Sequence, residues 1–310
     1  MTGSDLILVA DIGGTNTRVA LGDRAGRLHH VRTVRNVDVR DLREPLEAAI
    51  GSNNITDAVL AVAGPVDGDN VAVTNHPWKI SQPLLRKSLG LARLTLINDF
   101  LAAAYAAPTV GDDELLYLQG GAVSRRGNIL VCGPGTGFGV AALIDSARGR
   151  VGIASEAGHI ILGAADGAEE AVFDRLRKDG EPIGVETILS GEGLSRLYGA
   201  MNSTPLRSEE IISRLQAGDS KATTSVSLFL SIFGRVSGDL ALAYNAMSGV
   251  FLTGGVGRAL ARHYQSSPFL DSFRNHPPFS RQLMETPVAV LLHEQPGLLG
   301  ALQFGLAQPV

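Results

Sequence analysis

The sequence predicts an α/β protein built from two related domains, and three observations favour that fold. Short apolar segments that end in glycine-rich turns alternate with segments of helical pattern, which is typical of a fold with much parallel sheet. A strand, glycine turn and strand that begin at Ile7 have a second copy that begins at Ile129. The length of 310 residues suits about two domains.

The first third of the chain supplies most of the expected elements. Apolar runs predict strands over residues 6–10, 18–22, 57–63 and 94–97, with a further strand near 30–33. Helical patterns lie over residues 42–50 and 100–107. Strands and helices that alternate in this way imply an α/β fold.

The internal copy also points to two domains. When ILVADIGGTNTRVALGD is written over ILVCGPGTGFGVAALID, ILV stands over ILV and Gly13 stands over Gly135. Two similar strand–turn–strand units suggest two related domains facing one another. A chance likeness is the alternative, because apolar strands and glycine turns are common. Asp11 of the first copy becomes Gly133 in the second, so only the first turn keeps a carboxylate.

The rest of the chain gives fewer elements. A strand is predicted over residues 250–253, ending at Gly254-Gly255, and a helix over 258–265. The C-terminal segment 296–307 has the pattern of a glycine-punctuated helix. Proline, glycine and acidic residues near 108–113 mark a candidate domain boundary.

Composition and charge argue against several classes of protein. Hydrophobic residues make up 45% and charged residues 19%, which is the balance of a soluble globular protein. The net charge of −4 gives no support to a nucleic-acid or acidic-membrane partner. The start lacks a signal-peptide pattern and no run of about 18 apolar residues appears, so a cytoplasmic protein without a membrane span is expected. With Cys132 as the one cysteine, neither an internal disulfide nor a cysteine-rich zinc site is expected.

The first glycine turn has the residues of a phosphate site. It runs Asp11, Ile12, Gly13, Gly14, Thr15 and Asn16. Glycines let a backbone turn bring its N–H groups against an anion, and the threonine and asparagine add side-chain donors. Asp11, at the end of the strand, is a candidate for holding Mg²⁺ through water, because that ion keeps several waters in phosphate sites. The alternative is an ordinary hairpin turn, for which Gly-Gly is common.

The second glycine turn runs GPGTGFG from Gly133 to Gly139. It is not the Rossmann fingerprint, because Phe138 stands where the third glycine is needed, and no Walker lysine follows it. The plain alternative is a tight turn without a ligand. Paired with the first turn, it suggests two hairpins that grip one polyphosphate.

Asn98 and Asp99 follow a predicted strand and open a predicted helix. Asp99 is a candidate general base at the carboxyl edge of the sheet, where open α/β sheets bind ligands. The alternative is structural, because aspartate is among the preferred N-cap residues. Taken alone, this position favours the N-cap.

Three further residues are candidates for holding sugar hydroxyls. Glu156 and His159 belong to the string EAGH, where a carboxylate accepts from two hydroxyls and a histidine donates or accepts. A di-iron site would need two such motifs on helices, and only one is present. Glu186, in GVETILSG, is ambiguous alone, because a first-turn glutamate commonly complements a helix N-terminus. For the EAGH pair the alternative is a solvated loop.

Taken together, these strings resemble the bacterial glucokinase family of the actin-like sugar kinases. The matches run nearly end to end, and their order and number distinguish them from an accidental likeness. They are DIGGTNTR at 11–18, AGPV at 63–66, TNHPW at 74–78, LINDF at 96–100, GPGTGFG at 133–139, EAGH at 156–159, ETILSG at 186–191, LTGGV at 252–256 and PGLLG at 296–300.

The resemblance implies a two-domain actin-like ATPase (ribonuclease H-like) fold with a central cleft. It places a small domain over residues 1–109, with 299–310 returning to it, and a large domain over 110–298. It also implies transfer of the γ-phosphate of ATP to the 6-hydroxyl of glucose, with Mg²⁺ as cofactor and Asp99 as the base. The residues that resemble those holding the sugar are Asn98, Asp99, Glu156, His159 and Glu186.

The nucleotide residues also come from the resemblance. The two glycine turns look like phosphate loops, and Gly254-Gly255 looks like the turn on the adenosine side. The expected ATP-binding residues are Asp11, Ile12, Gly13, Gly14, Thr15, Asn16, Gly133, Gly135, Thr136, Gly137, Gly254 and Gly255.

Related kinases and repressors of the ROK group carry a zinc-binding cysteine cluster near their EAGH-like segment, and this chain lacks those cysteines. Zinc is therefore not expected, and neither is a repressor's helix-turn-helix, because the phosphate motif begins at residue 11. The resemblance further implies a homodimer. Donors other than ATP stay open.

Three alternatives to a glucose kinase remain. They are a kinase for another hexose or amino sugar, a silent sugar sensor, and an actin-like assembly protein. Intact Asp11 and Asp99 argue against the sensor, and the hydroxyl-binding residues argue against the assembly protein.

Overall fold

The computed structural model describes residues 6–121, 126–147, 149–177 and 180–308. Its contacts divide the chain into two compact units. Unit 1 comprises Met1–Val110 and His293–Val310, and unit 2 comprises Gly111–Leu292. The sequence analysis expected domain boundaries at 109/110 and 298/299. The contacts divide the structure at 110/111 and 292/293. The second division falls where the chain leaves the sheet of unit 2 and runs toward the C-terminal helix.

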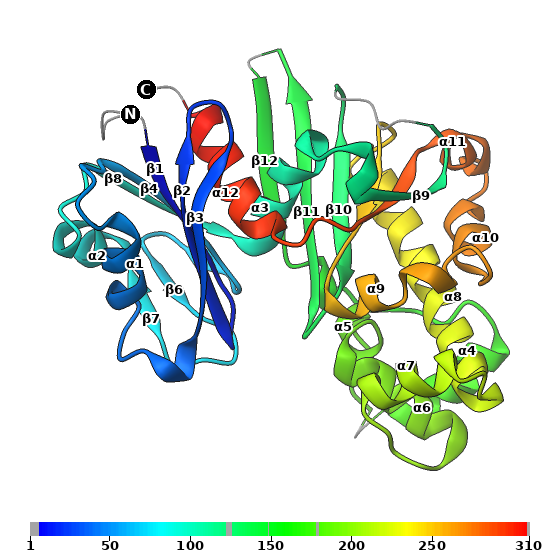
Figure 1. The fold of residues 1–310 in the computed structure, drawn as a ribbon. Helices are drawn as coiled ribbons and strands as arrows, with labels where there is room; N and C mark the ends of the chain where they lie inside the picture. Colours follow the sequence, from blue (N-terminus) through cyan, green and yellow to red (C-terminus); the bar gives the residue numbers. More distant parts are fainter. Residues whose placement is uncertain (1–5, 122–125, 148, 178–179, 309–310) are drawn as a thin grey trace. The chain divides into compact units, whose positions relative to one another are not determined.

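Unit 1 is organised around a five-stranded sheet (Figure 1). In the order β3-β2-β1-β4-β8, its strands are Leu28–Arg35, Asn16–Asp23, Leu6–Ile12, Asp57–Val62 and Arg93–Asn98. The first three strands form an antiparallel meander, whereas β4 and β8 run parallel to β1. A smaller sheet joins β5 (Val66–Asp67), β6 (Asn70–Ala72) and β7 (Lys79–Ser81). The predicted strands of this half are confirmed, each with slightly different ends.

Helices cover both faces of this sheet. Alternate residues of β1 point to opposite sides, and the buried apolar side chains on each side pack against helices. Leu8 packs in one cluster with Leu46 of α1 (Arg43–Ile50) and Leu85 of α2 (Gln82–Ser88). Val9 packs in another with Ala102 of α3 (Asp99–Ala106) and Leu298 of α12 (Pro296–Ala307). The C-terminal helix therefore completes the core of the N-terminal unit, as the resemblance implied.

Two glycines of the PGLLG string allow α12 to reach its place. A Cβ at position 300 would lie 1.6 Å from the carbonyl oxygen of Ala102 in α3, so only glycine permits that approach. A Cβ at position 297 would lie 2.5 Å from Cγ of Asp11. The first turn of α12 therefore lies directly against the carboxylate at the end of β1.

Unit 2 repeats the same topology around a six-stranded sheet. In the order β12-β11-β10-β13-β14-β9, its strands are Gly149–Ser155, Phe138–Ser146, Ile129–Pro134, Val250–Leu252, Val288–Leu291 and Leu115–Gln119. An antiparallel meander is again followed by two parallel strands, and β9 adds an antiparallel edge. This shared topology confirms the internal repeat that the sequence predicted.

Among the helices of unit 2, the long α8 (Ser220–Ala243) has buried apolar residues that belong to the core of the unit. The others are α4 (Gly167–Leu176), α5 (Val185–Ile188), α6 (Gly191–Asn202), α7 (Ser208–Gln216), α9 (Gly255–Ala259), α10 (Phe269–Arg274) and α11 (Ser280–Glu285). By length and composition alone α8 meets the criterion for a membrane span, but a buried core helix of a soluble protein meets it equally. Gly234 and Gly238 let α8 approach α10, because a Cβ at either position would overlap backbone atoms of Phe269 or Phe273.

The predicted helix over 258–265 is wrong. The helix α9 begins earlier, directly after the strand β13, and ends at Ala259. A separate 3-10 turn follows over Ala261–His263. The break lies at Leu260, whose backbone leaves the α-helical region with φ −90° and ψ 5°. The buried hydroxyl of Tyr264 donates to the carbonyl of Gly257 at 3.1 Å.

Cys132 lies fully buried in β10, 3.7 Å from the hydroxyl of Ser237. Burial raises the pKa of its thiol to about 12, so the reactive thiolate is almost absent near pH 8. We expect Ellman's reagent to leave the native protein essentially unmodified and to titrate one thiol after unfolding in urea. Rapid stoichiometric labelling without denaturant would contradict this packing.

Candidate functional site

The first glycine turn joins β1 to β2 within unit 1. The N–H of Gly13 donates to the carbonyl of Asn16 at 3.0 Å, which closes the turn. A Cβ at position 14 would lie 2.6 Å from the carbonyl oxygen of Thr74. The TNHPW segment therefore packs against this turn, and Gly14 is required by that approach as well as by any ligand.

Asp11 is the penultimate residue of β1, and its carboxylate is largely buried. Its Oδ2 accepts from Nη1 of Arg18 at 3.3 Å across the β1–β2 ladder. Burial raises the pKa of the Asp11 carboxyl, while the charge of Arg18 and its hydrogen bond oppose that rise. A carboxylate held this way, with one oxygen committed to Arg18, suits an ion that keeps its own waters, as Mg²⁺ does.

The structural alternative, in which Asp99 is the N-cap of the following helix, is wrong. The N-cap of α3 is Asn98, whose Oδ1 accepts from the N–H groups of Phe100 and Leu101 at 2.9 and 3.1 Å. Asp99 is the first residue of the helix, and its Oδ1 also accepts from the Phe100 N–H at 2.9 Å. Nδ2 of Asn98 reaches the carbonyl of Gly64 at 3.3 Å. Asn98 is thus fixed by contacts of its own, and the helix does not need Asp99 as a cap.

The second glycine turn joins β10 to β11 in unit 2, and its stem lies against the Gly254-Gly255 turn. A Cβ at position 133 would lie 1.9 Å from the carbonyl oxygen of Thr253. Gly254 has φ +84°, and a Cβ there would lie 2.3 Å from the carbonyl oxygen of Pro134. Only glycines fit where these two backbones meet. The turn expected to hold phosphate and the turn expected on the adenosine side are therefore neighbours.

Glu186, in the first turn of α5, holds the tip of this second turn. Its Oε2 accepts from the backbone N–H of Phe138 at 2.7 Å. A Cβ at position 137 would lie 2.3 Å from the same oxygen, so Gly137 makes room for the carboxylate. The N–H of Gly191 also donates to the carbonyl of Gly135 at 2.9 Å. A residue expected to hold sugar is thus bonded directly to a turn expected to hold phosphate.

Glu156 precedes a short 3-10 helix, η5 (Ala157–His159), that follows β12, and His159 is the last residue of that helix. Both side chains are exposed, and Nε2 of His159 lies 3.9 Å from Oε2 of Glu156. A Cβ at position 158 would lie 2.5 Å from the carbonyl oxygen of Phe138. Gly158 therefore lets the EAGH segment lie against the start of β11.

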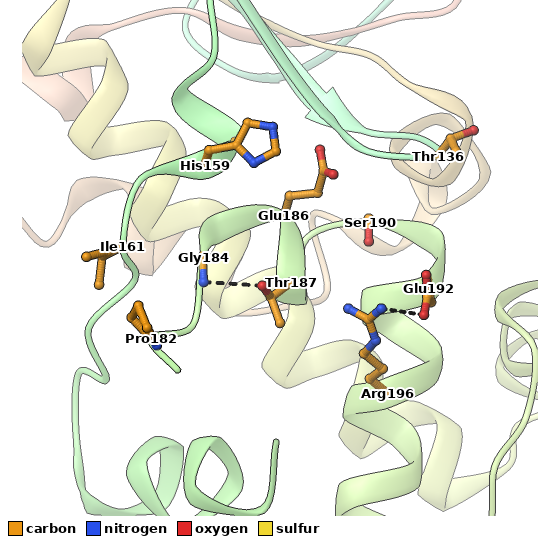
Figure 2. A pocket seen from close by; sticks show the side chains of 11 residues that line it. Thr136, His159, Ile161, Pro182, Gly184, Glu186, Thr187, Ser190, Glu192 and Arg196 are labelled. Carbon is orange, nitrogen blue, oxygen red and sulfur yellow. Dashed lines mark hydrogen bonds and ion pairs between the residues drawn. The ribbon is translucent and has the colours of Figure 1, made fainter. Parts of the chain in front are cut away.

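A polar pocket of about 260 Å³ gathers three of the predicted residues within unit 2. His159, Glu186 and Thr136 lie around it, and Figure 2 shows the imidazole and the carboxylate beside the same space. Glu156 does not line this pocket. Hydroxyl-binding groups and a glycine-turn threonine thus meet in one cavity, which suits a polyhydroxylated ligand next to a phosphate.

The sequence reasoning missed other residues of this pocket. Thr187, Ser190, Glu192 and Arg196 also line it, and the last two form an ion pair across one turn of α6. Thr187 and Ser190 belong to the ETILSG string, from which only Glu186 was selected. Their signal was present in the motif, but a hydroxyl beside a helix start is also an ordinary cap. Ser190 does cap α6, accepting from the Gly193 N–H at 2.9 Å.

The predicted site residues fall into two groups, one in each unit. Unit 1 carries Asp11–Asn16 at the end of β1 and in the turn after it, and Asn98 and Asp99 where β8 meets α3, with β4 between the two strands. Unit 2 carries the residues around the second glycine turn together with Glu156, His159 and Glu186. Among the described residues, no cluster of three or more His, Cys, Asp or Glu side chains is arranged to hold a metal.

Comparison with known proteins gives consistent matches. The family model described as Glucokinase matches residues 8–308. The glucokinase of Pectobacterium atrosepticum is 36% identical over 305 residues, and that of Psychromonas ingrahamii is 34% identical over 304, each alignment covering 95% of both chains. Among solved structures, a glucokinase from an Antarctic psychrotroph has a TM-score of 0.87 at 32% identity, covering 97% of this chain and 98% of the other.

Proposed function

This chain belongs to the glucokinase family and is an ATP-dependent glucose kinase, and we propose how its residues share the transfer of the γ-phosphate to the 6-hydroxyl of D-glucose. The observation that carries the proposal is the bond between Glu186 and the second glycine turn. The bond supports the proposal because it joins a carboxylate proposed to hold sugar hydroxyls to a backbone turn proposed to hold phosphate.

In this proposal Asp99 is the base. Its carboxylate takes the proton of the 6-hydroxyl as the sugar oxygen bonds to the γ-phosphorus, and the bond to the β,γ-bridging oxygen breaks to release ADP. Phosphoryl transfer of this kind depends mainly on positioning and on neutralising charge. Backbone N–H groups of the two glycine turns would supply donors to the phosphate oxygens.

Mg²⁺ is proposed as the cofactor, held through water by Asp11. When bound to ATP, the ion neutralises phosphate charge. The residues present fit it, because a single buried carboxylate with one oxygen committed to Arg18 leaves the remaining coordination to water and phosphate. Arg18 would keep this carboxylate oriented in the absence of the ion.

Asn98, Glu156, His159 and Glu186 are proposed to hold the sugar hydroxyls. His159 and Glu186 share the pocket in Figure 2. Asn98 is rigid because its amide already bonds to the start of α3 and to Gly64. A rigid donor beside Asp99 would fix the hydroxyl that reacts.

Replacing His159 by alanine is expected to raise the KM for glucose while leaving the KM for ATP unchanged. Loss of one partner in a buried sugar complex costs about 1–3 kcal/mol, which corresponds to about 5–150-fold in KM. Steady-state kinetics with each substrate varied in turn measures both constants. Ile160→Ala, at an exposed neighbour that does not line the pocket, is the control, and equal KM values for glucose in the two variants would remove His159 from the site.

The proposed acceptor is tested with ATP and a panel of sugars in a coupled assay for ADP. Glucose is expected to give the highest kcat/KM, above fructose, mannose and N-acetylated amino sugars. A much higher kcat/KM for another sugar would identify that sugar, and not glucose, as the acceptor. No turnover with any sugar would favour a silent sensor.

We further propose a cytoplasmic homodimer, on the support of the family resemblance. The edge strand β12 offers apolar surface for a second copy, because Val151 and Ile153 are exposed there. Sedimentation velocity at micromolar concentration is expected to show about twice the monomer mass, and a single monomeric species under those conditions would contradict the dimer.

A further inference from the structure

Asn36 is a buried polar residue to which the sequence analysis gave no role. It directly follows β3 and begins a short 3-10 helix, η2 (Asn36–Asp38). Only 2% of its surface is exposed. Buried amides need partners for their donors and acceptors, and those of Asn36 all lie in or beside the first glycine turn.

Three hydrogen bonds of 2.8 Å tie Asn36 to this turn. Its Nδ2 donates to the carbonyl of Gly13, and its backbone N–H donates to the carbonyl of Thr15. Its Oδ1 accepts from the hydroxyl of Thr17, which is itself fully buried. One residue therefore holds the start of the turn, its end and the strand that leaves it.

These bonds decide where the N–H groups of the turn point. Gly13 and Gly14 have no side chains to limit their backbone angles, so the sequence of the turn alone does not fix one conformation. The carbonyls of Gly13 and Thr15 are held by their hydrogen bonds from Asn36. Because a peptide unit is planar, the N–H group in the same plane as each carbonyl is held in direction as well. A preorganised set of donors binds an anion better than a flexible one, because less ordering is needed on binding.

The internal repeat supports the same interpretation from the other unit. The segment after the third strand of the meander is η2 in unit 1 and η5 in unit 2. In unit 2 that segment carries Gly158, which lies against the carbonyl of Phe138 at the end of the second glycine turn. Both units thus use the same place in the chain to support their glycine turn, once by an amide and once by close packing.

We propose that Asn36 is a positioning residue for nucleotide binding, which holds the first glycine turn in the conformation that receives the phosphates of ATP. The proposal rests on the proposed function of that turn. Asn36 itself touches no substrate, and its effect passes through Gly13, Thr15 and Thr17.

Binding measurements on Asn36→Ala test this role. Affinity for the ATP analogue AMP-PNP, measured with Mg²⁺ by calorimetry, is expected to fall about tenfold, because the variant loses the two side-chain hydrogen bonds to Gly13 and Thr17. Affinity for adenosine, which has no phosphates, and the KM for glucose are expected to stay within twofold. Loss of all three affinities in proportion would show a general structural role and overturn the proposal.

A matched control removes a similar set of side-chain hydrogen bonds at the other end of β2, the strand that carries Thr17. Asp23 ends β2, is 4% exposed, and accepts from the N–H groups of Ala25 and Arg27 at 2.9 and 3.0 Å. Asp23→Ala is expected to lower the Tm but to leave AMP-PNP affinity within twofold of the parent. If Asp23→Ala weakened AMP-PNP as much as Asn36→Ala, the effect of Asn36 would be loss of stability and not positioning.

A second pair of variants tests the same contact without changing Asn36. Thr17→Val removes the hydroxyl that donates to Oδ1 of Asn36, and Thr17→Ser keeps it. AMP-PNP affinity is expected to fall about fivefold or more in the valine variant and to be recovered in the serine variant. Equal affinities in the two would contradict the proposal. The binding readouts do not depend on catalysis, so a parent protein that failed to phosphorylate glucose would refute the proposed function and leave this test intact.

Discussion

Replacing Asp99 by asparagine is expected to lower kcat by about 10²–10⁴-fold, the usual contribution of a general base. The amide keeps the size and one acceptor oxygen of the carboxylate, so the bond from the Phe100 N–H to that oxygen can be retained. The amide cannot take the hydroxyl proton. Since Asn98 is the N-cap of α3, the change should leave the fold and glucose binding intact.

Thermal melting with and without glucose, together with steady-state kcat, separates chemistry from folding. A parent-like Tm, a retained shift with glucose and a collapsed kcat are expected for Asp99→Asn. The control for stability alone is Asp219→Ala, which removes the side-chain cap of α8 and is expected to cost about 1 kcal/mol of stability. A kcat for Asp99→Asn within a few-fold of the parent would exclude Asp99 as the base.

Replacing Glu186 by alanine is expected to raise both the KM for glucose and the KM for ATP, each about tenfold or more. The carboxylate lines the pocket proposed to hold sugar and accepts from the Phe138 N–H in the turn proposed to hold phosphate. Its removal therefore leaves two partners unmatched. His159→Ala is expected to affect glucose alone, and the contrast between the two variants isolates the second contact.

Glu186→Gln separates the effect of the bond to the Phe138 N–H from the effect of the proposed contact with the sugar. Its amide oxygen can still accept from the Phe138 N–H, so the KM for ATP is expected to return to within about twofold of the parent, while the KM for glucose stays raised. Measuring both constants for the alanine and glutamine variants tests this. An ATP constant that did not change in Glu186→Ala would show that the phosphate turn does not need Glu186.

The fold was accessible from the sequence because its signals are local. Apolar strands such as Leu6–Ile12, the glycine turns after them and the repeated hairpin all lie within short stretches of chain. The helix over 258–265 failed for the opposite reason. Its interruption lies at Leu260, whose backbone leaves the α-helical region, and a helical pattern does not reveal such a break.

The site was accessible only in part, because its residue types can be read from motifs but their contacts cannot. Asp99 and Asn98 were both selected, yet which of them caps the helix depends on backbone geometry. Glu186 was selected for sugar alone, since its partner Phe138 is far away in the sequence. Asn36 was missed because NVDV resembles an ordinary end of a strand, and only the fold brings its amide to Gly13.

The position of the new phosphate tests the central claim most directly. The protein is incubated with ATP, Mg²⁺ and uniformly ¹³C-labelled glucose, and the product is followed by ¹³C and ³¹P nuclear magnetic resonance. The expected result is glucose 6-phosphate as the single sugar phosphate, formed together with an equal amount of ADP. A phosphate on any other hydroxyl, or ADP formed without a sugar phosphate, would contradict the proposal that Asp99 directs the 6-hydroxyl of glucose onto ATP.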